Sequence, residues 1–522
     1  MMGTERSQHP PRGESRSGRM AQALSRTAVM HDAGKSDVGV VPLKLSNNPV
    51  PVAGAEMVEG RPTTNGNPLQ PPATGAQYPA ATLSGLERIR QAAKKERKLR
   101  FTSLFHHLTP ALLFEAYESL RRDAAPGVEG MTWHAYGEAA WEHIARLHQQ
   151  VQGGAYRAQP SKRAWIPKAD GRQRPLGIAA LEDKIVQKAV GWILEAIYEV
   201  DFAGFSYGFR PGRSQHRALD AVCVGIEGLP VNWVLDADIQ GFFDTLDHEW
   251  LMRFLEHRVA DPRMLRLIRK WLRAGVSEQG VWSKTTVGTP QGAVISPLLA
   301  NVYLHYVFDL WVKWWRQRHA VGAVMVVRYA DDFVVGFEHQ ADAERFRSEL
   351  QERFARFGLT LHAQKTRLIE FGRHASARRL ARGDRKPETF NFLGFTHICA
   401  RRRTDGRFTV LRQTMAKRLS ARIAAIRDGL RERLNVPIAE QGAWLRRVVQ
   451  GYFAYHGVPC NGRALMRFKS LVERAWIWSL RRRGQRGRIT WEQAKTHFAR
   501  WLPAVRITHP YPNQRLRVSY QR

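Results

Sequence analysis

The chain has 522 residues, too many for one compact domain, so two or three folded units are expected. Its Lys and Arg exceed its Asp and Glu by 34, and this charge predicts a polyanionic partner, nucleic acid before an anionic membrane. Its three cysteines are widely spaced, which excludes a Cys-rich zinc module and a disulfide framework, and no apolar run is long enough to predict a membrane-spanning helix.

The first part of the chain, residues 1–84, is rich in Pro, Gly, Ser, Ala and Thr and contains few large apolar residues. Such a composition buries too little surface to fold alone, so we expect a disordered leader. Helical periodicity begins at Leu86 and opens an N-terminal extension over 85–155. Within it, Thr109-Pro110 predicts the start of a second helix.

The region from 156 to about 400 mixes strand and helix patterns. A basic hairpin is expected over 165–178, with its turn at 169–171. Residues 231–239 predict a strand that ends in acidic residues, and 390–395 predict a later strand.

Beyond residue 410 the pattern becomes helical and basic. Amphipathic stretches predict helices over 412–434, 438–455 and 462–482, and Thr490 is a good N-cap for a shorter one. Residues 401–522 hold 28 Lys and Arg against 6 Asp and Glu. This excess predicts a phosphate-binding surface better than it predicts an ordinary solvated face.

Aromatic residues alternate with cations along these helices. We expect Phe453 and Trp476 in the helix core, so that only the cations meet nucleic acid. The candidate nucleic-acid contacts in this region are Arg481, Arg482 and Arg483.

The segment Tyr329-Ala330-Asp331-Asp332 lies between two apolar, largely β-branched runs at 323–327 and 333–337. Such runs predict a buried β-hairpin whose turn carries two adjacent carboxylates. Unpaired buried carboxylates are costly, so this placement calls for a compensating divalent cation. An acidic turn in solvent is the alternative for the tetrapeptide taken alone.

A second strand end supplies further carboxylates. Asp236 and Asp238 share one face because side chains alternate along a strand. If this strand pairs with the hairpin, Asp238 meets Asp331 and Asp332 around two cations, the arrangement of two-metal nucleotidyl transfer. Asp236 is better interpreted as a strand residue that is hydrogen-bonded to backbone.

These two acidic segments resemble the catalytic motifs of reverse transcriptases. Other segments resemble further motifs of that family and follow in the family order between residues 166 and 395. They are Ile166-Pro167-Lys168 with Gly177-Ile178, the segments 207–214 and 288–301, Leu359-Thr360-Leu361-His362 with Lys365-Thr366, and Phe392-Leu393-Gly394-Phe395.

More narrowly, the chain resembles a bacterial group II intron reverse transcriptase/maturase from about residue 85 to its end. Glu129 stands where the family usually has Asp, and Gln240 where Lys is common, but neither change removes a metal ligand. The segments that carry the narrower likeness are 125–130, 451–459, 482–487 and 509–512.

The resemblance implies an α+β fold of the right-hand polymerase type. Fingers and palm, with an antiparallel palm sheet, are expected over 156–406, and an α-helical thumb/maturase domain over 407–484. A small basic DNA-binding region is expected over 485–522. Many relatives carry a zinc-bearing DNA endonuclease, and the lack of cysteines for one leads us to expect an endonuclease-less type.

The resemblance also implies a metal site. Asp238 and Asp331 are the principal ligands expected, the carbonyl of Ile239 completes the site, and Asp332 is more peripheral. The implied cofactor is Mg²⁺, as two ions, with Mn²⁺ as a substitute.

The implied nucleotide site involves both fingers and palm. Lys168 and Arg174 lie on opposite arms of the basic hairpin and are expected to clamp the triphosphate, with Lys162 as a third candidate. Phe243 is expected to stack under the sugar and exclude a 2′-hydroxyl, with core packing as its alternative. Gln291 is expected to contact the incoming nucleotide or the template, or else to stabilise a turn.

Three further basic residues have open alternatives. Lys365 is expected to donate a proton to pyrophosphate, or else to snorkel from a strand. Arg210 and Arg213 are expected at the template backbone, with a loop salt bridge as the alternative.

The implied function is an RNA-directed DNA polymerase that also binds its group II intron RNA to promote splicing and mobility. The implied partners are that intron RNA, an RNA template with a DNA primer or target DNA, and dNTPs, without a membrane, in the bacterial cytoplasm. The sequence is compatible with a monomer or a dimer. Two alternatives stay open: a retron or CRISPR-associated reverse transcriptase, and an RNA-binding splicing factor with a vestigial polymerase site.

Overall fold

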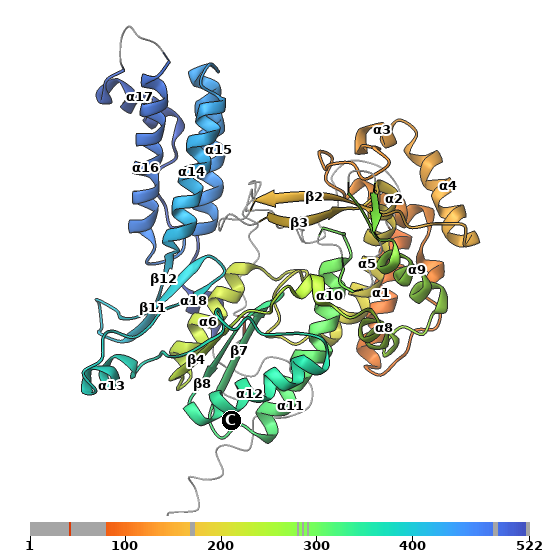
Figure 1. Ribbon diagram of the computed structural model, residues 1–522, viewed down its shortest axis with the longest axis horizontal. Helices are drawn as coiled ribbons and strands as arrows, with labels where there is room; N and C mark the ends of the chain where they lie inside the picture. The colour runs from red at the N-terminus through yellow and green to blue at the C-terminus, as the bar shows by residue number, and fades with distance from the viewer. Residues whose placement is uncertain are drawn as a thin grey trace, which may run out of the picture.

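The computed structural model describes residues 41–42, 80–167, 173–278, 281–283, 287–289, 292–483 and 489–517. A four-stranded sheet occupies the middle of the molecule (Figure 1). N-terminal helices and a second sheet lie to one side of it, and an upright bundle of helices rises on the other (Figure 1). These parts are the palm, fingers and thumb of a right hand, so the expected α+β polymerase fold is confirmed. The expected leader lies almost wholly outside the described residues.

The N-terminal layer is helical. Its elements are α1 (Ala80–Lys95), the 3₁₀ turn η1 (Phe105–His107), α2 (Pro110–Glu118), α3 (Trp133–Gly137), α4 (Ala140–Gly153) and α5 (Leu181–Asp201). Thr109 caps α2 as predicted, because its Oγ1 accepts the Leu112 N–H at 3.2 Å and Pro110 occupies the first turn. Both α1 and α2 pack against α5, which carries one apolar face into the main core.

A small mixed sheet forms the fingers, with strand order β3-β2-β5-β6. Its strands are β2 (Ser161–Pro167), β3 (Gln173–Ile178), β5 (Val276–Glu278) and β6 (Val281–Ser283). β2 and β3 pair antiparallel, from Lys162 opposite Ile178 to Pro167 opposite Gln173, which confirms the expected hairpin. This hairpin points across the molecule toward the helical bundle (Figure 1).

The palm sheet is antiparallel, with strand order β7-β8-β4-β9. Its strands are β4 (Trp233–Ala237), β7 (Val324–Tyr329), β8 (Asp332–Phe337) and β9 (Arg367–Glu370). Alternate residues of β7 enter two separate cores: Val324 and Val326 the one shared with α12 (Gln340–Arg356), Met325 and Val327 the one shared with α6 (Gln215–Gly228). The sheet is therefore covered on both faces. Polar groups gather at the end of its strands near residue 330.

The other helices of fingers and palm surround these two sheets. They are α7 (Phe242–Thr245), α8 (His248–Glu256), α9 (Pro262–Arg273), α10 (Ser296–Leu304), the π-helical turn η2 (His305–Asp309), α11 (Leu310–Arg318) and α13 (Ala375–Ala381). α10, η2 and α11 follow one another without an intervening loop.

A third sheet, β10-β11-β12, joins the palm to the thumb. Its strands are β10 (Phe390–Phe392), β11 (Phe395–Arg401) and β12 (Phe408–Thr414). The expectation of one strand over 390–395 was wrong, because Leu393 and Gly394, with φ of 46° and 85°, form a two-residue hairpin turn inside it. Positive φ at both loop positions is the geometry that matches the twist of paired strands.

The thumb is a bundle of helices with its own core. Its members are α14 (Ala416–Glu432), α15 (Ile438–His456), α16 (Gly462–Arg481) and α17 (Trp491–Trp501). Phe453 and Trp476 are both buried in that core, as expected. Thr490 caps α17 with a capping box, also as expected, whereas α14 starts four residues later than predicted because β12 runs to Thr414.

The C-terminal segment returns from the thumb to the palm. It contains α18 (Pro512–Arg515) and β13 (Leu516–Arg517), and β13 pairs with β1 (Val41–Pro42). Asp220 of α6, which is fully buried, binds both Arg412 at 2.6 Å and Arg515 at 2.5 Å. The expected domain boundaries stay predictions. Among the described residues, no helix is long and apolar enough to span a bilayer.

Candidate active site

The β7–β8 hairpin has a two-residue loop, Ala330 and Asp331, because Tyr329 pairs with Asp332. Ala330 has a φ of 56°, a left-handed value that residues with a Cβ rarely adopt. Asp332 opens β8, so the two carboxylates leave the hairpin from its loop and from its first strand residue. The predicted hairpin with an acidic turn is confirmed.

The register of β4 places a third carboxylate beside them. Asp236 pairs with Val334 and Ala237 with Phe333, so Asp238 follows at the level of Asp332. Residues opposite one another in an antiparallel pair project from the same face. Asp236, Asp238 and Asp332 therefore lie on one face of the palm sheet, next to the turn that carries Asp331.

The Asp236 carboxylate interacts with a basic side chain of the palm sheet. Burial raises its pKa to about 7, the nearby Arg367 lowers it, and the carboxylates of Asp332 and Asp238 raise it again. Its carboxylate lies 3.8 Å from the Arg367 guanidinium. Asp236 is thus a strand residue of β4, as expected, and its hydrogen bond to backbone stays a prediction.

Lys365 lies directly at Asp238. Its Nζ is 2.6 Å from Asp238 Oδ2, and the Asp238 carbonyl accepts the His362 N–H at 2.8 Å. The neighbouring Ile239 forms a bridge with Leu361, which binds the two segments together. Lys365 therefore does not snorkel from a strand. Its role as a proton donor to pyrophosphate stays a prediction.

The chemistry of these groups fits divalent cations. Carboxylate oxygens are hard donors of the kind that Mg²⁺ prefers, and several carboxylates lie at one end of the palm sheet. In the described part of the chain, no three His, Cys, Asp or Glu side chains already form a complete ligand cluster. Lys365 binds Oδ2 of Asp238, so a metal ion at that oxygen would compete with Lys365.

The loop before α10 is fixed against the helix that carries Phe243. Phe242 is buried in the core, while Phe243 on the same short helix is half-buried. The Phe243 carbonyl accepts the Thr289 N–H at 2.8 Å, and a Cβ on Gly288 would lie 2.8 Å from that same oxygen. Gln291 lies outside the described residues, so its role stays a prediction.

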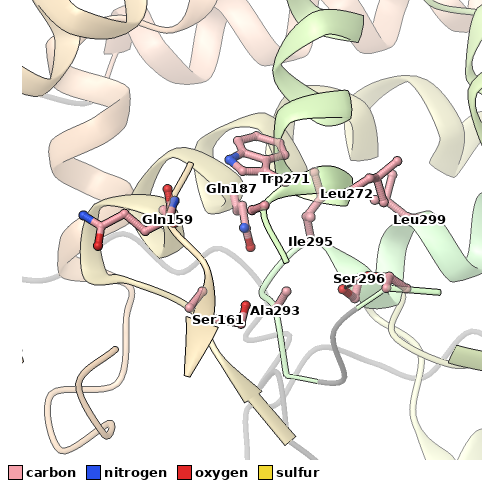
Figure 2. Close-up of a pocket in the computed structure, with 13 residues that line it drawn as sticks. Gln159, Ser161, Gln187, Trp271, Leu272, Ala293, Ile295, Ser296 and Leu299 are labelled. Atoms are coloured by element: carbon pink, nitrogen blue, oxygen red, sulfur yellow. Dashed lines mark hydrogen bonds between the residues drawn. The ribbon is translucent and has the colours of Figure 1, made fainter. Parts of the chain in front are cut away.

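A small cavity lies behind this loop, lined by Gln159, Gln187, Trp271 and their neighbours (Figure 2). Its volume of about 20 Å³ has room for little more than one water molecule, so it is not a nucleotide site. Gln187 accepts the Val294 N–H at 3.1 Å through Oε1. The cavity wall therefore supports the loop rather than binding substrate.

The triphosphate clamp is described only in part. Lys162 is exposed on β2 opposite Ile178. Lys168 lies outside the described residues, and so does the side chain of Arg174, whose backbone pairs with Ile166. These three assignments stay predictions.

Arg210 is not available to a template, which corrects one expectation. Its side chain is buried and forms a double contact with Glu199 at 2.9 and 2.7 Å, and its Nη1 donates to the carbonyls of Ala203 and Ser206. The loop salt bridge is therefore the correct alternative. Arg213 is half-buried, donates to the Gly204 carbonyl at 2.5 Å, and lies over the Tyr207 ring.

The three thumb arginines differ in exposure. Arg481 and Arg482 are exposed; Arg481 donates to the Ile489 carbonyl at 3.0 Å, and Arg482 lies 4.6 Å from the Trp478 ring centroid. Arg483 is half-buried and donates to the Val436 carbonyl. Their contacts with nucleic acid stay predictions, with Arg481 and Arg482 better placed than Arg483.

A buried polar network behind the β7–β8 hairpin was not predicted from the sequence. Arg328 is fully buried on β7 and pairs with Asp309, which is also fully buried. The sequence did carry a signal, since Arg328 is a charged residue inside an otherwise apolar strand. Its partners, however, lie 19 and 27 residues earlier in the chain.

The palm sheet, the fingers hairpin and the helical thumb define a right-hand nucleic-acid polymerase. Residues 166–397 match the protein family described as "Reverse transcriptase (RNA-dependent DNA polymerase)". The group II intron-encoded protein LtrA of Lactococcus lactis subsp. cremoris is 37% identical over 242 residues, 45% of this chain and 40% of LtrA. Protein YkfC of Escherichia coli (strain K12) is 34% identical over 293 residues, 48% of this chain and 76% of YkfC.

A more distant relative is the putative COX1/OXI3 intron 1 protein of Saccharomyces cerevisiae, 30% identical over 203 residues, 39% of this chain and 24% of that protein. The chain belongs to the reverse transcriptase family, in its group II intron-encoded branch. It spans about two fifths of the length of LtrA and about three quarters of YkfC. Reverse transcriptases use divalent metal ions, in keeping with the carboxylate cluster of the palm.

Proposed function

We propose that the protein is an RNA-directed DNA polymerase that also binds a group II intron RNA and promotes its splicing and mobility. The observation that carries the polymerase proposal is the strand register that sets Asp238 level with Asp332, next to the turn that carries Asp331. The chain would extend a DNA primer or target DNA on an RNA template, using dNTPs.

The metal ligands in this proposal are Asp238, Asp331, the carbonyl of Ile239 and, more peripherally, Asp332. Two Mg²⁺ ions, or Mn²⁺ in their place, would activate the 3′-hydroxyl and neutralise the triphosphate when bound. Lys365 would hand a proton to pyrophosphate, and its Nζ, 2.6 Å from Asp238 Oδ2, supports this role.

The nucleotide would enter between the palm and the fingers hairpin. Lys162, Lys168 and Arg174 belong to that hairpin and would bind the triphosphate. Phe243 would exclude a 2′-hydroxyl, which supports the preference for dNTPs. The fixed position of its helix against the Gly288 loop supports this role.

The RNA-binding part of the proposal rests on charge and on relatives. The thumb and the C-terminal region hold 28 Lys and Arg against 6 Asp and Glu over residues 401–522. Matched relatives include the group II intron-encoded protein LtrA and a nuclear intron maturase 1 of Arabidopsis thaliana. Phosphate contacts by Arg481 and Arg482 would hold structured RNA by shape and charge, in the bacterial cytoplasm.

Primer extension on an RNA template tests the polymerase proposal. The purified chain should extend a DNA primer with dNTPs and Mg²⁺, and Asp331→Asn should lose at least about 1,000-fold because a metal ligand is removed. Asp428→Asn, at an exposed aspartate of α14, is the matched control and should extend normally. No cDNA with either Mg²⁺ or Mn²⁺ would refute the polymerase and leave an RNA-binding splicing factor.

Binding of the intron RNA is measured separately. Asp331→Asn should keep its RNA affinity, since its site differs from the thumb. Arg481→Gln with Arg482→Gln should weaken binding and lower the slope of log affinity against log salt by about one for each phosphate that is no longer neutralised. An unchanged slope would remove these two arginines from the RNA interface.

A further inference from the structure

The guanidinium of Arg328 binds four acceptors behind the catalytic hairpin. Its Nε and Nη2 donate to the two carboxylate oxygens of Asp309 at 2.8 and 2.6 Å. Its Nη1 donates to Asn301 Oδ1 and to the Ala330 carbonyl, each at 3.0 Å. Both Arg328 and Asp309 are fully buried, so these bonds form away from solvent.

The Ala330 carbonyl belongs to the strained residue of the turn. Ala330 has a φ of 56°, and such values persist only where the surroundings determine them. On its other side, the backbone nitrogen of Ala330 packs against Gly208 so closely that a Cβ there would collide with it. The residue that precedes Asp331 is thus held from both sides.

Asn301 connects the two sides. Its Oδ1 accepts from Arg328, and its Nδ2 donates to the Gly208 carbonyl at 2.7 Å. The backbone of Arg328 also pairs with the same segment, since its N–H donates to Phe205 and its carbonyl accepts from Tyr207, both at 2.8 Å. Arg328 and Asn301 together therefore link the turn, α10 and the segment before α6.

Asp309 lies at the end of the π-helical turn η2, between α10 and α11. Such turns occur often at functional sites. Its other neighbour is His305, with Nδ1 at 3.9 Å, and burial lowers the pKa of that histidine to about 4. Arg328 is therefore the cationic partner of Asp309 at neutral pH.

We propose that Arg328 is a positioning residue for polymerisation, which holds Ala330 in its left-handed conformation and thereby fixes the direction of the Asp331 carboxylate. This inference rests on the proposed polymerase function. The planar fork is essential to it, because a lysine offers a point charge that cannot span Asp309, Asn301 and Ala330 together.

The test compares two Arg→Lys variants. Arg328→Lys keeps a cation opposite Asp309, so the buried charge stays compensated. Arg258→Lys is the matched control: Arg258 is also buried, and its Nε lies 3.0 Å from Asp201, but it binds the backbone near residue 96 instead of the hairpin.

Two readouts separate positioning from simple structural support. In primer extension, Arg328→Lys should lower kcat about 100-fold while the KM for dNTP changes little, because a misdirected ligand affects the reacting geometry. In amide hydrogen exchange, peptides over 324–337 should lose protection while the rest of the palm keeps it. Arg258→Lys should leave both kcat and hairpin protection near their wild-type values.

A second variant tests the strained residue itself. Glycine adopts a φ of 56° without the steric cost, so Ala330→Gly added to Arg328→Lys should recover a measurable part of kcat. Wild-type hairpin protection with wild-type kcat in Arg328→Lys would overturn the proposal. So would a loss of protection throughout the chain with no recovery by Ala330→Gly, because Arg328 would then be merely structural.

These readouts also separate this inference from the polymerase proposal. If the wild-type chain extends no primer, the polymerase proposal fails. Hydrogen exchange of the hairpin still decides whether Arg328 holds the turn, since it needs neither metal nor substrate.

Discussion

In the described part of the chain, two hairpin turns have a left-handed residue other than glycine, and different chemistry holds each of them. The turn of β7–β8 has Ala330 at a φ of 56°, and a buried guanidinium binds its carbonyl. The turn of β10–β11 has Leu393 at a φ of 46°, and the Tyr455 hydroxyl donates to its carbonyl at 2.7 Å. The first belongs to the palm sheet, and the second lies at the joint between palm and thumb.

Three buried histidines lie near the second turn, in contact with Phe395, Phe392 or Tyr455. Burial lowers the pKa of His216, His397 and His456 to about 3, so all three are uncharged at neutral pH. His456 packs on Phe395, and His397 stacks on Phe390 with ring centroids 4.6 Å apart. A permanent charge thus binds the palm turn, whereas the joint between palm and thumb also contains histidines that can be protonated.

Among the changes that compare these two turns, the largest effect is expected from Gly208→Ala. A Cβ at this position would collide with the Ala330 nitrogen, so the hairpin would have to shift and primer extension should fall about 100-fold. Gly153→Ala at the end of α4 is the control, because an added Cβ there meets no atom within 4 Å. RNA affinity should not change in either variant. Wild-type extension by Gly208→Ala would mean that the hairpin tolerates displacement.

The next prediction concerns how pH affects the stability of the joint between palm and thumb. A buried histidine with a folded pKa near 3 and an unfolded pKa near 6.5 stabilises the fold fully above pH 6.5. That stability is lost as the pH falls from 6.5 toward 3, by about 1.4 kcal/mol per pH unit for each such histidine, because only the unfolded state binds the proton. Acid should therefore lower the stability of the joint between palm and thumb.

Other buried groups oppose this trend, so the measurement compares the free energy of unfolding of a variant with that of the wild type. Burial raises the pKa of Asp183 and Asp201 to about 6 and of Glu195 to about 7, and these acids favour the fold as the pH falls. His397→Phe removes one titrating group from the joint and keeps an aromatic ring there. Chemical denaturation of both proteins should show the variant gaining on the wild type by about 1.4 kcal/mol per pH unit below 6.5. A constant difference would mean that His397 is already protonated in the fold.

Sequence patterns predicted the elements that local periodicity determines. The β7–β8 hairpin and β4 are short apolar runs that end in acids, and the thumb helices carry a helical repeat with a capping box at Thr490. Because strand side chains alternate, this pattern was enough to place Asp236 and Asp238 on one face. It was also enough to assign Phe453 and Trp476 to the thumb core.

Features that depend on partners elsewhere in the chain were not predictable. Arg210 looked like a template contact because nothing in its motif identifies Glu199 as its partner. The split at Leu393 was missed because a leucine disfavours the left-handed conformation that the fold imposes on it. The role of Arg328 likewise depends on Asp309, which a pattern of apolar residues cannot select.

The smallest effect is expected from Tyr455→Phe. This change leaves the buried Leu393 carbonyl without its hydroxyl donor, which should cost about 1–2 kcal/mol of folding free energy and leave kcat nearly unchanged. Its combination with Arg328→Lys sharpens the contrast between the two turns. Because the Arg328 guanidinium binds the Ala330 carbonyl and the Tyr455 hydroxyl binds the Leu393 carbonyl, in two different turns, their destabilisations should add to within about 0.5 kcal/mol. A larger coupling in denaturation experiments would show that the two hairpins move as one unit, and that the thumb joint transmits its state to Asp331.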